Sequence, residues 1–151
     1  MEFIVSERIR YQLSASVFVM LMRDGELCML RRKGTGWMDG SFSIPAGGLD
    51  AGETIGAAAI REAYEEVGVN IAAENLHHVH TLHSKTDGRT WLGHFFQATI
   101  WEGTPALREL DKHGDLQWRP LNALPSETIP YVRQAILCAA AQQPYSEYGW
   151  D

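Results

Sequence analysis

The sequence predicts a single α/β domain in which a mixed β-sheet packs between helices. Strand-like segments both precede and separate two helical segments, an order that is typical of this class. No linker, internal repeat or low-complexity segment divides the 151 residues, and this length is sufficient for one hydrophobic core. We therefore expect one domain over residues 1–151.

The first part of the chain predicts a hairpin and a short strand. Residues 13–23 are largely apolar and typical of a buried strand, the Asp-Gly pair that follows is a hairpin signal, and residues 26–32 would form the returning strand. The glycine-rich segment 33–40 predicts a surface loop, and residues 41–45 a short strand.

The first helix is expected to begin near Glu53 or Thr54 and to end at Gly68, since glycine readily adopts the backbone conformation that caps a helix. Small residues in its apolar stripe would allow the helix to approach a sheet closely. The stripe comprises Ala59, Ile60, Ala63 and Val67.

The second half of the chain predicts strands at 75–83, 91–101 and 116–119, and a second helix from Pro130 to about Gln142. Residues 144–151 form an aromatic tail with Tyr145, Tyr148 and Trp150. This tail is either a flexible terminus, as many chain ends are, or it docks on the domain, on a second subunit or at the mouth of a substrate site.

Charge, cysteine content and hydropathy limit the binding partners and the compartment that we expect for this protein. The net charge of −6 argues against a general affinity for nucleic-acid polymers or anionic membranes. Cys28 and Cys138 lie in apolar contexts and predict buried free thiols rather than a disulfide framework. The N-terminus lacks a leader pattern and no segment approaches 18 consecutive apolar residues, so we expect a cytoplasmic protein.

Three glutamates of the first helix lie three and four residues apart, at Glu62, Glu65 and Glu66. Residues so spaced share one helix face, where like charges repel by a few tenths of a kcal/mol per pair. Hard carboxylate oxygens in a cluster suit Mg²⁺ or Mn²⁺. The alternative is that the carboxylates are simply solvated, as most adjacent glutamates are.

The surrounding spacing resembles the Nudix box, in which a glycine, a glutamate and an Arg-Glu pair precede two further glutamates and a glycine. The matching residues are Gly47, Glu53, Arg61, Glu62, Glu65, Glu66 and Gly68, with Ala63 and Val69 at apolar positions. The resemblance implies an α/β/α sandwich with a mixed sheet. It also implies metal-dependent hydrolysis of a nucleoside diphosphate linked to another group X.

The resemblance also implies residue roles. Glu62, Glu65 and Glu66 would bind the Mg²⁺ or Mn²⁺ ion, together with the backbone carbonyl at Gly47. Glu53 would lie near the metal and Arg61 would orient the carboxylates. Outside this motif, Arg61 would be interpreted as an ordinary surface partner of Glu65.

The general base varies among similar proteins. Candidates are a helix glutamate or an acidic residue in the loop 103–116, where Glu109 is our choice over Asp111 and Asp115. That loop could equally be a polar connection without chemistry.

Substrate contacts are expected from two arginines and two aromatic residues. Arg31 and Arg32 end a strand before the box, and alternation allows only one of them to reach substrate phosphates. Trp37 and Tyr131 are candidates for stacking on a base, although packing explains most single aromatic residues. The histidines receive no chemical role, and alternation predicts His78 and His80 on one strand face.

The substrate expected from the resemblance is a nucleoside triphosphate, cut to monophosphate and pyrophosphate. Sequence markers of ADP-ribose, dinucleoside-polyphosphate and coenzyme A hydrolases are missing around the box. The alternatives are a nucleotide-sugar or other nucleoside-diphosphate-X hydrolase and, in another class, a nucleotide-sensing module without catalysis. The expected partner is a small nucleotide rather than a nucleic-acid polymer or membrane, with a homodimer left open.

Overall fold

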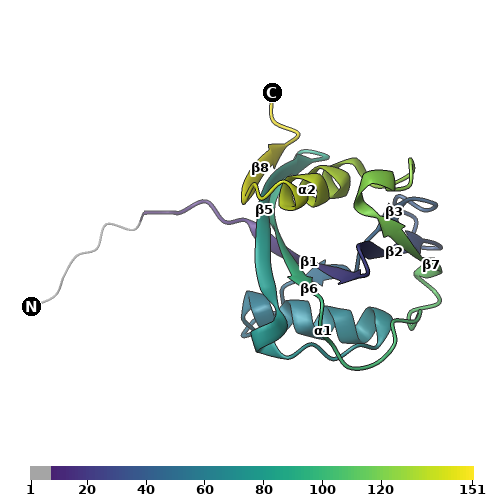
Figure 1. Cartoon of the computed structure of the whole chain (residues 1–151). Coiled ribbons are helices and arrows are strands. Elements are labelled where there is room, and N and C mark those ends of the chain that lie inside the picture. Colours follow the sequence, from purple (N-terminus) through teal and green to yellow (C-terminus); the bar gives the residue numbers. More distant parts are fainter. Residues whose placement is uncertain (1–7) are drawn as a thin grey trace, which may run out of the picture.

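The computed structural model describes residues 8–151. Residues 1–7, the start of the predicted domain and of the terminus predicted to lack a leader, lie outside the described residues. A mixed sheet lies between helix α1 (Ile55–Val67) and helix α2 (Pro130–Ala140), which confirms the predicted sandwich (Figure 1). No helix in the described part is long and apolar enough to span a membrane.

Within residues 8–151 the sheet has eight strands, β1 (Ser14–Arg23), β2 (Glu26–Arg32), β3 (Phe42–Ser43), β4 (Ala46–Gly48), β5 (His77–Thr86), β6 (Arg89–Ala98), β7 (His113–Pro120) and β8 (Tyr145–Tyr148). Their order is β3-β2-β1-β6-β5-β8, with β4 paired to β1 and β7 paired to β2. The β1–β6 and β5–β8 pairs are parallel, and the remaining named pairs are antiparallel. A short 3₁₀ turn, Ala73–Asn75, precedes β5, and another, Leu121–Ala123, follows β7.

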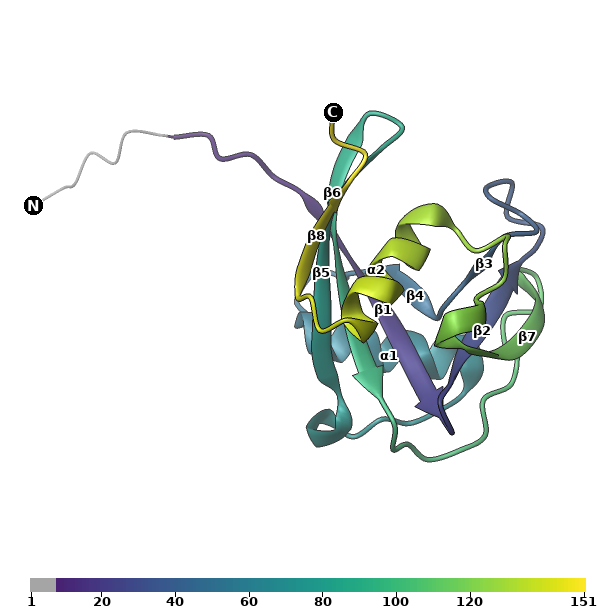
Figure 2. The same ribbon diagram turned by 45° about the horizontal axis from the view of Figure 1, so that its top comes forward.

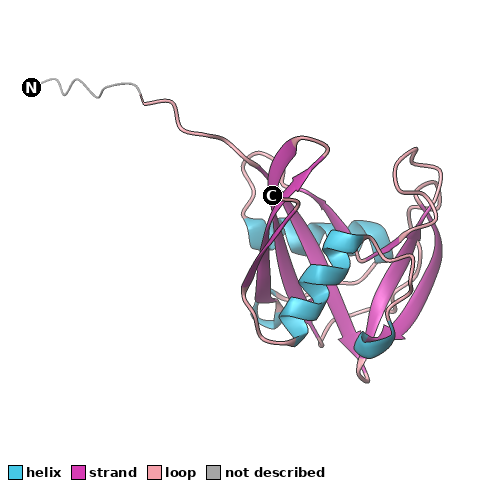
Figure 3. Ribbon diagram, turned by 90° about the horizontal axis from the view of Figure 1, so that it is seen from above, coloured by secondary structure: helices cyan, strands magenta, loops and turns pink. Residues whose placement is uncertain are grey.

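Strand β1 separates two groups of strands. In Figure 2, β5, β6 and β8 stand on one side of β1, while β2, β3 and β7 lie on the other. In the view from above, α2 crosses in front of the strands and the described segment before β1 leads away from the body (Figure 3).

Successive side chains of β1 point alternately into two hydrophobic cores, one on each face of the strand. Val17, Val19 and Leu21 pack in the core that contains α1, whereas Phe18 and Met20 pack in the core that contains α2. A buried strand with both faces covered has to be apolar almost throughout, which is the pattern in the sequence.

The element predictions were correct in type and less accurate at boundaries. Asp24 and Gly25 form the predicted hairpin turn, and Asp87-Gly88, which has the same positive φ values, forms a second one. This turn extends the end of β5 from the predicted residue 83 to residue 86. It also places β6 at 89–98 instead of the predicted 91–101. The strand predicted at 41–45 is shortened to β3, and β4 begins only after Pro45, which has no N–H to pair.

Two expectations about single side chains were wrong. Cys28 is fully buried, and burial raises its pKa to about 12, but Cys138 is only half-buried because it lies beside the inward stripe of α2. A β-bulge between His78 and His80 breaks strict alternation. As a result His78 contacts Phe96 in one core and His80 contacts Phe95 in the other.

The aromatic tail docks on the domain's own sheet. Residues Tyr145–Tyr148 form β8, which pairs in parallel with β5 at the sheet edge and runs beside α2 (Figures 1 and 2). His80 contributes to this docking, because its ring nitrogens lie 2.7 Å from the Gln143 carbonyl and 2.8 Å from Ser146 Oγ.

Candidate active site

Helix α1 is capped at both ends, and its C-terminal cap is the predicted Gly68. Thr54 Oγ1 accepts a hydrogen bond from the Ala57 N–H at 3.1 Å, and Gly68, with φ 76°, donates its N–H to the Tyr64 carbonyl at 2.9 Å. The helix therefore presents Glu62, Glu65 and Glu66 from a fixed segment that packs directly beside β4.

Arg61 is the centre of the ionic network. Its guanidinium donates two hydrogen bonds to Glu53, at 3.0 and 2.7 Å, and one each to Glu62 at 2.8 Å and Glu65 at 3.2 Å. It also donates to the Gly48 carbonyl at 3.1 Å, which ties α1 to β4. These hydrogen bonds lower the pKa of Glu53 to about 2 and raise the pKa of Arg61.

Glu62 lies against the bare backbone of Gly47. A Cβ atom at Gly47 would lie 2.0 Å from Glu62 Oε1, so only glycine leaves room for this carboxyl group. Glu62 is 8% exposed, and burial raises its pKa, although Arg61 opposes that shift. The predicted closeness of Gly47 to a box glutamate is therefore present in the structure.

Glu66 is held from the neighbouring backbone. Its Oε2 accepts a hydrogen bond from the Ala46 N–H at 2.7 Å, and the side chain is almost fully enclosed. Burial raises its pKa well above the ordinary value, and the charges of Glu62 and Glu109 raise it further. Glu65 is the exposed member of the cluster, with a side-chain exposure of 49%.

The loop after β6 brings Glu109 to this cluster. Backbone N–H groups of Ala106 and Arg108 donate to the carbonyls of Val67 and Glu66, so the loop is attached to the last turn of α1. Glu109 is close enough to influence the pKa of both Glu62 and Glu66, and it forms an ion pair with Lys112 at 3.1 Å.

The competing loop acids have other surroundings. The Asp115 carboxylate accepts a hydrogen bond from Gln117 at 2.6 Å, and Asp111 is exposed. Of the three loop acids predicted as base candidates, Glu109 is thus the one that raises the pKa of both buried helix glutamates.

The cluster matches the donor chemistry of a hard divalent cation. The charge of Glu109 raises the pKa of both Glu62 and Glu66, a repulsion that a cation would relieve, and the side-chain-free backbone at Gly47 faces the Glu62 carboxyl group. Within residues 8–151, no three acidic, histidine or cysteine side chains are already arranged around one ion position. Arg61 holds Glu62 and Glu65, so these carboxylates would have to turn toward a cation.

A cleft of about 280 Å³ opens beside β4 on the α2 side of the sheet. It brings together both aromatic residues predicted to stack on a base. Its lining comprises Ser14, Ser16, Phe18, Trp37, Thr86, Arg89, Trp91 and Tyr131. Ser16 pairs with Gly48, so the cleft is one residue from the backbone that contacts the carboxylate cluster.

The two predicted arginines have different environments. Arg32 lies 4.8 Å from the Trp37 ring centroid and donates to the Trp37 carbonyl at 3.0 Å, whereas Arg31 lies over Phe42 and donates to the Gly40 carbonyl. Arg32 is therefore the arginine that contacts a cleft residue, Trp37.

Sequence reasoning missed several cleft residues. Thr86, Arg89 and Trp91 all come from the β5–β6 hairpin, and Thr86 fixes Trp91 by accepting a hydrogen bond from its indole N–H at 2.9 Å. The Asp-Gly turn signal at 87–88 could have identified this hairpin and placed these residues together.

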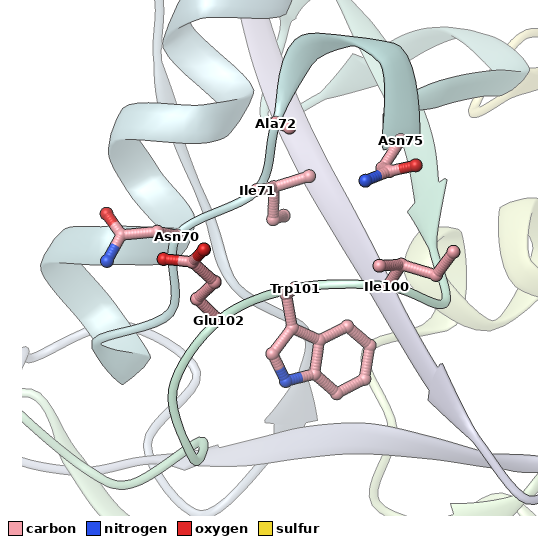
Figure 4. Close-up of a pocket in the computed structure, with 7 residues that line it drawn as sticks. All are labelled: Asn70, Ile71, Ala72, Asn75, Ile100, Trp101 and Glu102. Carbon is pink, nitrogen blue, oxygen red and sulfur yellow. The ribbon is translucent and has the colours of Figure 1, made fainter.

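A second cavity, of about 310 Å³, lies away from the carboxylate cluster (Figure 4). It is formed by the segment after α1 and the segment after β6, with Trp101 on one side and the Asn75 amide on the other. Glu102 is the ionisable residue in its lining, so the cavity does not assemble the groups needed for acid–base chemistry.

A mixed sheet between two helices, with buried carboxylates against a glycine strand and an aromatic cleft beside it, defines a hydrolase of the Nudix type. The NUDIX domain model matches residues 10–138, and the chain belongs to the Nudix family. Members of this family generally depend on divalent metal ions and act on small nucleotides.

Comparison with individual proteins supports this assignment. The chain is 32% identical over 114 residues to the NAD-capped RNA hydrolase NudC of Pseudomonas aeruginosa, which covers 76% of this chain and 38% of that relative. The chain thus spans less than half the length of the curated relatives it matches.

Solved structures agree in fold. A MutT Nudix hydrolase from Burkholderia pseudomallei is 25% identical with a TM-score of 0.77, covering 84% of this chain and 98% of that one. A Nudix hydrolase from Nitrosomonas europaea, at 21% identity, has a TM-score of 0.75 and covers 89% and 93% of the respective chains.

Replacing Gly47 by alanine should damage the site while leaving the fold intact. The new methyl group would displace the flexible end of Glu62, so we expect a loss in kcat of about 100-fold, as for an ångström-scale misplacement, with a nearly unchanged melting temperature. Gly48→Ala is the matched control, since a Cβ there meets nothing within 4 Å. Equal activity of the two variants would contradict this account of Gly47.

Glu53→Gln should reveal the ion pair with Arg61 through the pH dependence of stability. The lowered pKa of Glu53 means that its ionised form stabilises the fold above its unfolded pKa of about 4.3, and this contribution is lost as the pH falls toward 2. Wild type should therefore melt above Glu53→Gln at pH 7, with a gap that narrows below about pH 4.3. The exposed Glu74→Gln serves as the control, and a gap that is independent of pH would refute the prediction.

Proposed function

We propose that this protein hydrolyses the phosphoanhydride bond of a nucleoside diphosphate linked to a group X. The proposed substrate is a nucleoside triphosphate, which is cut to monophosphate and pyrophosphate. The observation that carries the proposal is the position of β4. Its Gly48 pairs with Ser16 of the aromatic cleft, while the adjacent Gly47 contacts Glu62 of the carboxylate cluster.

A nucleotide fits this arrangement by spanning β4. Its base would stack among Trp37, Trp91 and Tyr131, and its phosphates would extend across β4 toward α1. Arg32 and Arg89 supply positive charge on the cleft side of a protein that is acidic overall.

The carboxylates would complete the site. Glu62, Glu65 and Glu66 would hold Mg²⁺ or Mn²⁺ together with the Gly47 carbonyl, and a bound ion supplies Lewis-acid neutralisation of phosphate charge. Glu53 keeps Arg61 in place, and Arg61 orients Glu62 and Glu65. Glu109, which influences both buried glutamates, would accept the proton of the attacking water.

A second candidate substrate comes from the curated relatives, which are NAD-capped RNA hydrolases. A dinucleotide diphosphate contains the same bond and would also place a base in the cleft. A nucleotide sugar remains a further member of the same substrate class. A nucleotide-sensing module is disfavoured because all the box glutamates are present and the buried ones remain organised. The free thiols favour the cytoplasm as its compartment.

Hydrolysis should depend on a divalent cation and on Glu66. Chelation should abolish activity, and Mg²⁺ or Mn²⁺ should restore it. Glu65→Gln and Glu66→Gln should each lower kcat by on the order of 10²–10³-fold, the typical cost of removing one group that stabilises transition-state charge. Activity that persists after exhaustive chelation would contradict the metal role.

Melting temperatures test the role of Glu66 independently of activity. Burial disfavours the charged form of Glu66, so Glu66→Gln should melt no lower than wild type in EDTA and should lose the increase in melting temperature that Mn²⁺ gives wild type. Glu102→Gln, in the second cavity, is the control and should keep both activity and the Mn²⁺ response. If Glu66→Gln retained the Mn²⁺ response in full, Glu66 would not be a ligand.

Product analysis identifies the substrate. The purified protein should be incubated with Mg²⁺ and a panel of nucleoside triphosphates, NAD and nucleotide sugars, and the products should be separated by chromatography. We expect monophosphate and pyrophosphate from a triphosphate. Release of orthophosphate would contradict the proposed bond, and preferential cleavage of NAD would select the dinucleotide alternative.

A further inference from the structure

The cleft is built on a continuous series of aromatic contacts that extends to the C-terminal strand. Ring centroids lie 6.1 Å apart for Phe18–Trp91, 5.0 Å for Trp91–Tyr131 and 5.9 Å for Tyr131–Tyr148. Phe18, Trp91 and Tyr131, which we call the aromatic wall, line the cleft, whereas Tyr148 of β8 is not part of the lining. Tyr148 therefore contacts the wall through Tyr131 without lining the cleft itself.

Strand β8 is fixed on both sides. It pairs in parallel with β5, where Ser84 is opposite Tyr148, and Gln134 of α2 donates hydrogen bonds to Ser146 Oγ at 3.1 Å and to the Glu147 carbonyl at 3.0 Å. Figures 1 and 2 show β8 at the edge of the sheet beside β5, with α2, the helix that carries Tyr131, next to it. Strand β8, which carries Tyr148, is thus attached to α2, and α2 also carries Tyr131, the residue that Tyr148 contacts.

The chain end secures this strand. Gly149 adopts φ +83° and a Cβ there would lie 1.9 Å from the Lys85 carbonyl oxygen, so the turn after β8 requires glycine. Beyond the turn, the Trp150 indole donates to the His83 carbonyl at 3.1 Å and its ring lies 4.7 Å from the His83 ring. The last residues therefore return to β5 and hold Tyr148 in register.

We propose that Tyr148 is a positioning residue that fixes Tyr131, and through it Trp91, in the orientation that binds the nucleoside part of the substrate. This inference rests on the proposed function for the role of the cleft. Tyr148 lies outside the carboxylate cluster, so it acts on nucleoside binding and leaves the phosphate and metal half of the site unaltered. The C-terminal strand is accordingly part of the specificity apparatus of the domain.

The test separates nucleoside binding from phosphate binding. Tyr148→Ala should raise KM for the best nucleotide of the panel about three- to tenfold, the factor expected for a lost aromatic contact, with kcat within about twofold. It should weaken inhibition by AMP, GMP, CMP or UMP, whichever binds wild type, by the same factor. Inhibition by inorganic pyrophosphate should be unchanged.

Conservative and control variants make the result specific. Tyr148→Phe keeps the ring and should restore wild-type KM. Tyr145→Ala removes an aromatic residue from the same strand that is 51% exposed and points away from the wall, and it should leave KM unchanged. Gly149→Ala, which displaces the turn, should raise KM in the same direction as Tyr148→Ala.

Three results would overturn the proposal: an unchanged KM in Tyr148→Ala, an equal loss of pyrophosphate binding, or an equal effect of Tyr145→Ala. If Tyr148→Ala does not fold, Tyr148→Leu preserves apolar volume and should show the same KM increase. Should the wild type cleave no nucleotide, the proposed function fails, whereas the comparison of monophosphate with pyrophosphate affinity still tests the role of Tyr148.

Discussion

The architecture of the site depends on the attachment of α1 to β4 through Arg61. One guanidinium donates hydrogen bonds to Glu53, Glu62 and Glu65 and also to the Gly48 carbonyl, so it fixes helix and strand to each other. Without this cation, three carboxylates would lie close together, one of them almost buried. Removing one partner of a buried charge pair typically costs about 3–5 kcal/mol, and the 26% exposure of Arg61 places this network below that range.

Glu66 differs from these glutamates, because Arg61 does not hydrogen-bond to it in the part of the chain that the structure describes. It has no cationic side chain hydrogen-bonded to it in the described structure and relies on the Ala46 N–H, with the charge of Lys112 as a smaller influence. Its position is consequently unfavourable for an ionised group until a cation arrives. The backbone at the start of β4 imposes this arrangement, because the Ala46 N–H binds Glu66 and Gly47 leaves space for Glu62.

The sequence was sufficient to predict features encoded by local spacing. The Gly68 cap, the shared face of Glu62, Glu65 and Glu66 and the sandwich class all follow from residues in and next to one helix or from the order of elements. Long-range pairing was not predictable in this way. The bulge that separates His78 from His80, and the pairing of β8 with a strand some sixty residues earlier, depend on contacts that no local pattern specifies. Glu109 was a weak choice in sequence because its approach to α1 depends on the loop's backbone bonds to Val67 and Glu66.

The two halves of the site have different physical origins. The carboxylate half is constrained by charge and by the space that a glycine leaves, so few substitutions can preserve it, and its sequence signature is correspondingly strong. The aromatic half is constrained by ring packing, which many residues on many elements can satisfy, and it leaves no fixed spacing in the sequence. Here the wall comprises Phe18 from β1, Trp91 from β6 and Tyr131 from α2, and Tyr131 contacts Tyr148 of β8. The carboxylate half can therefore be predicted from a family motif, whereas the aromatic half becomes visible only once the chain is folded.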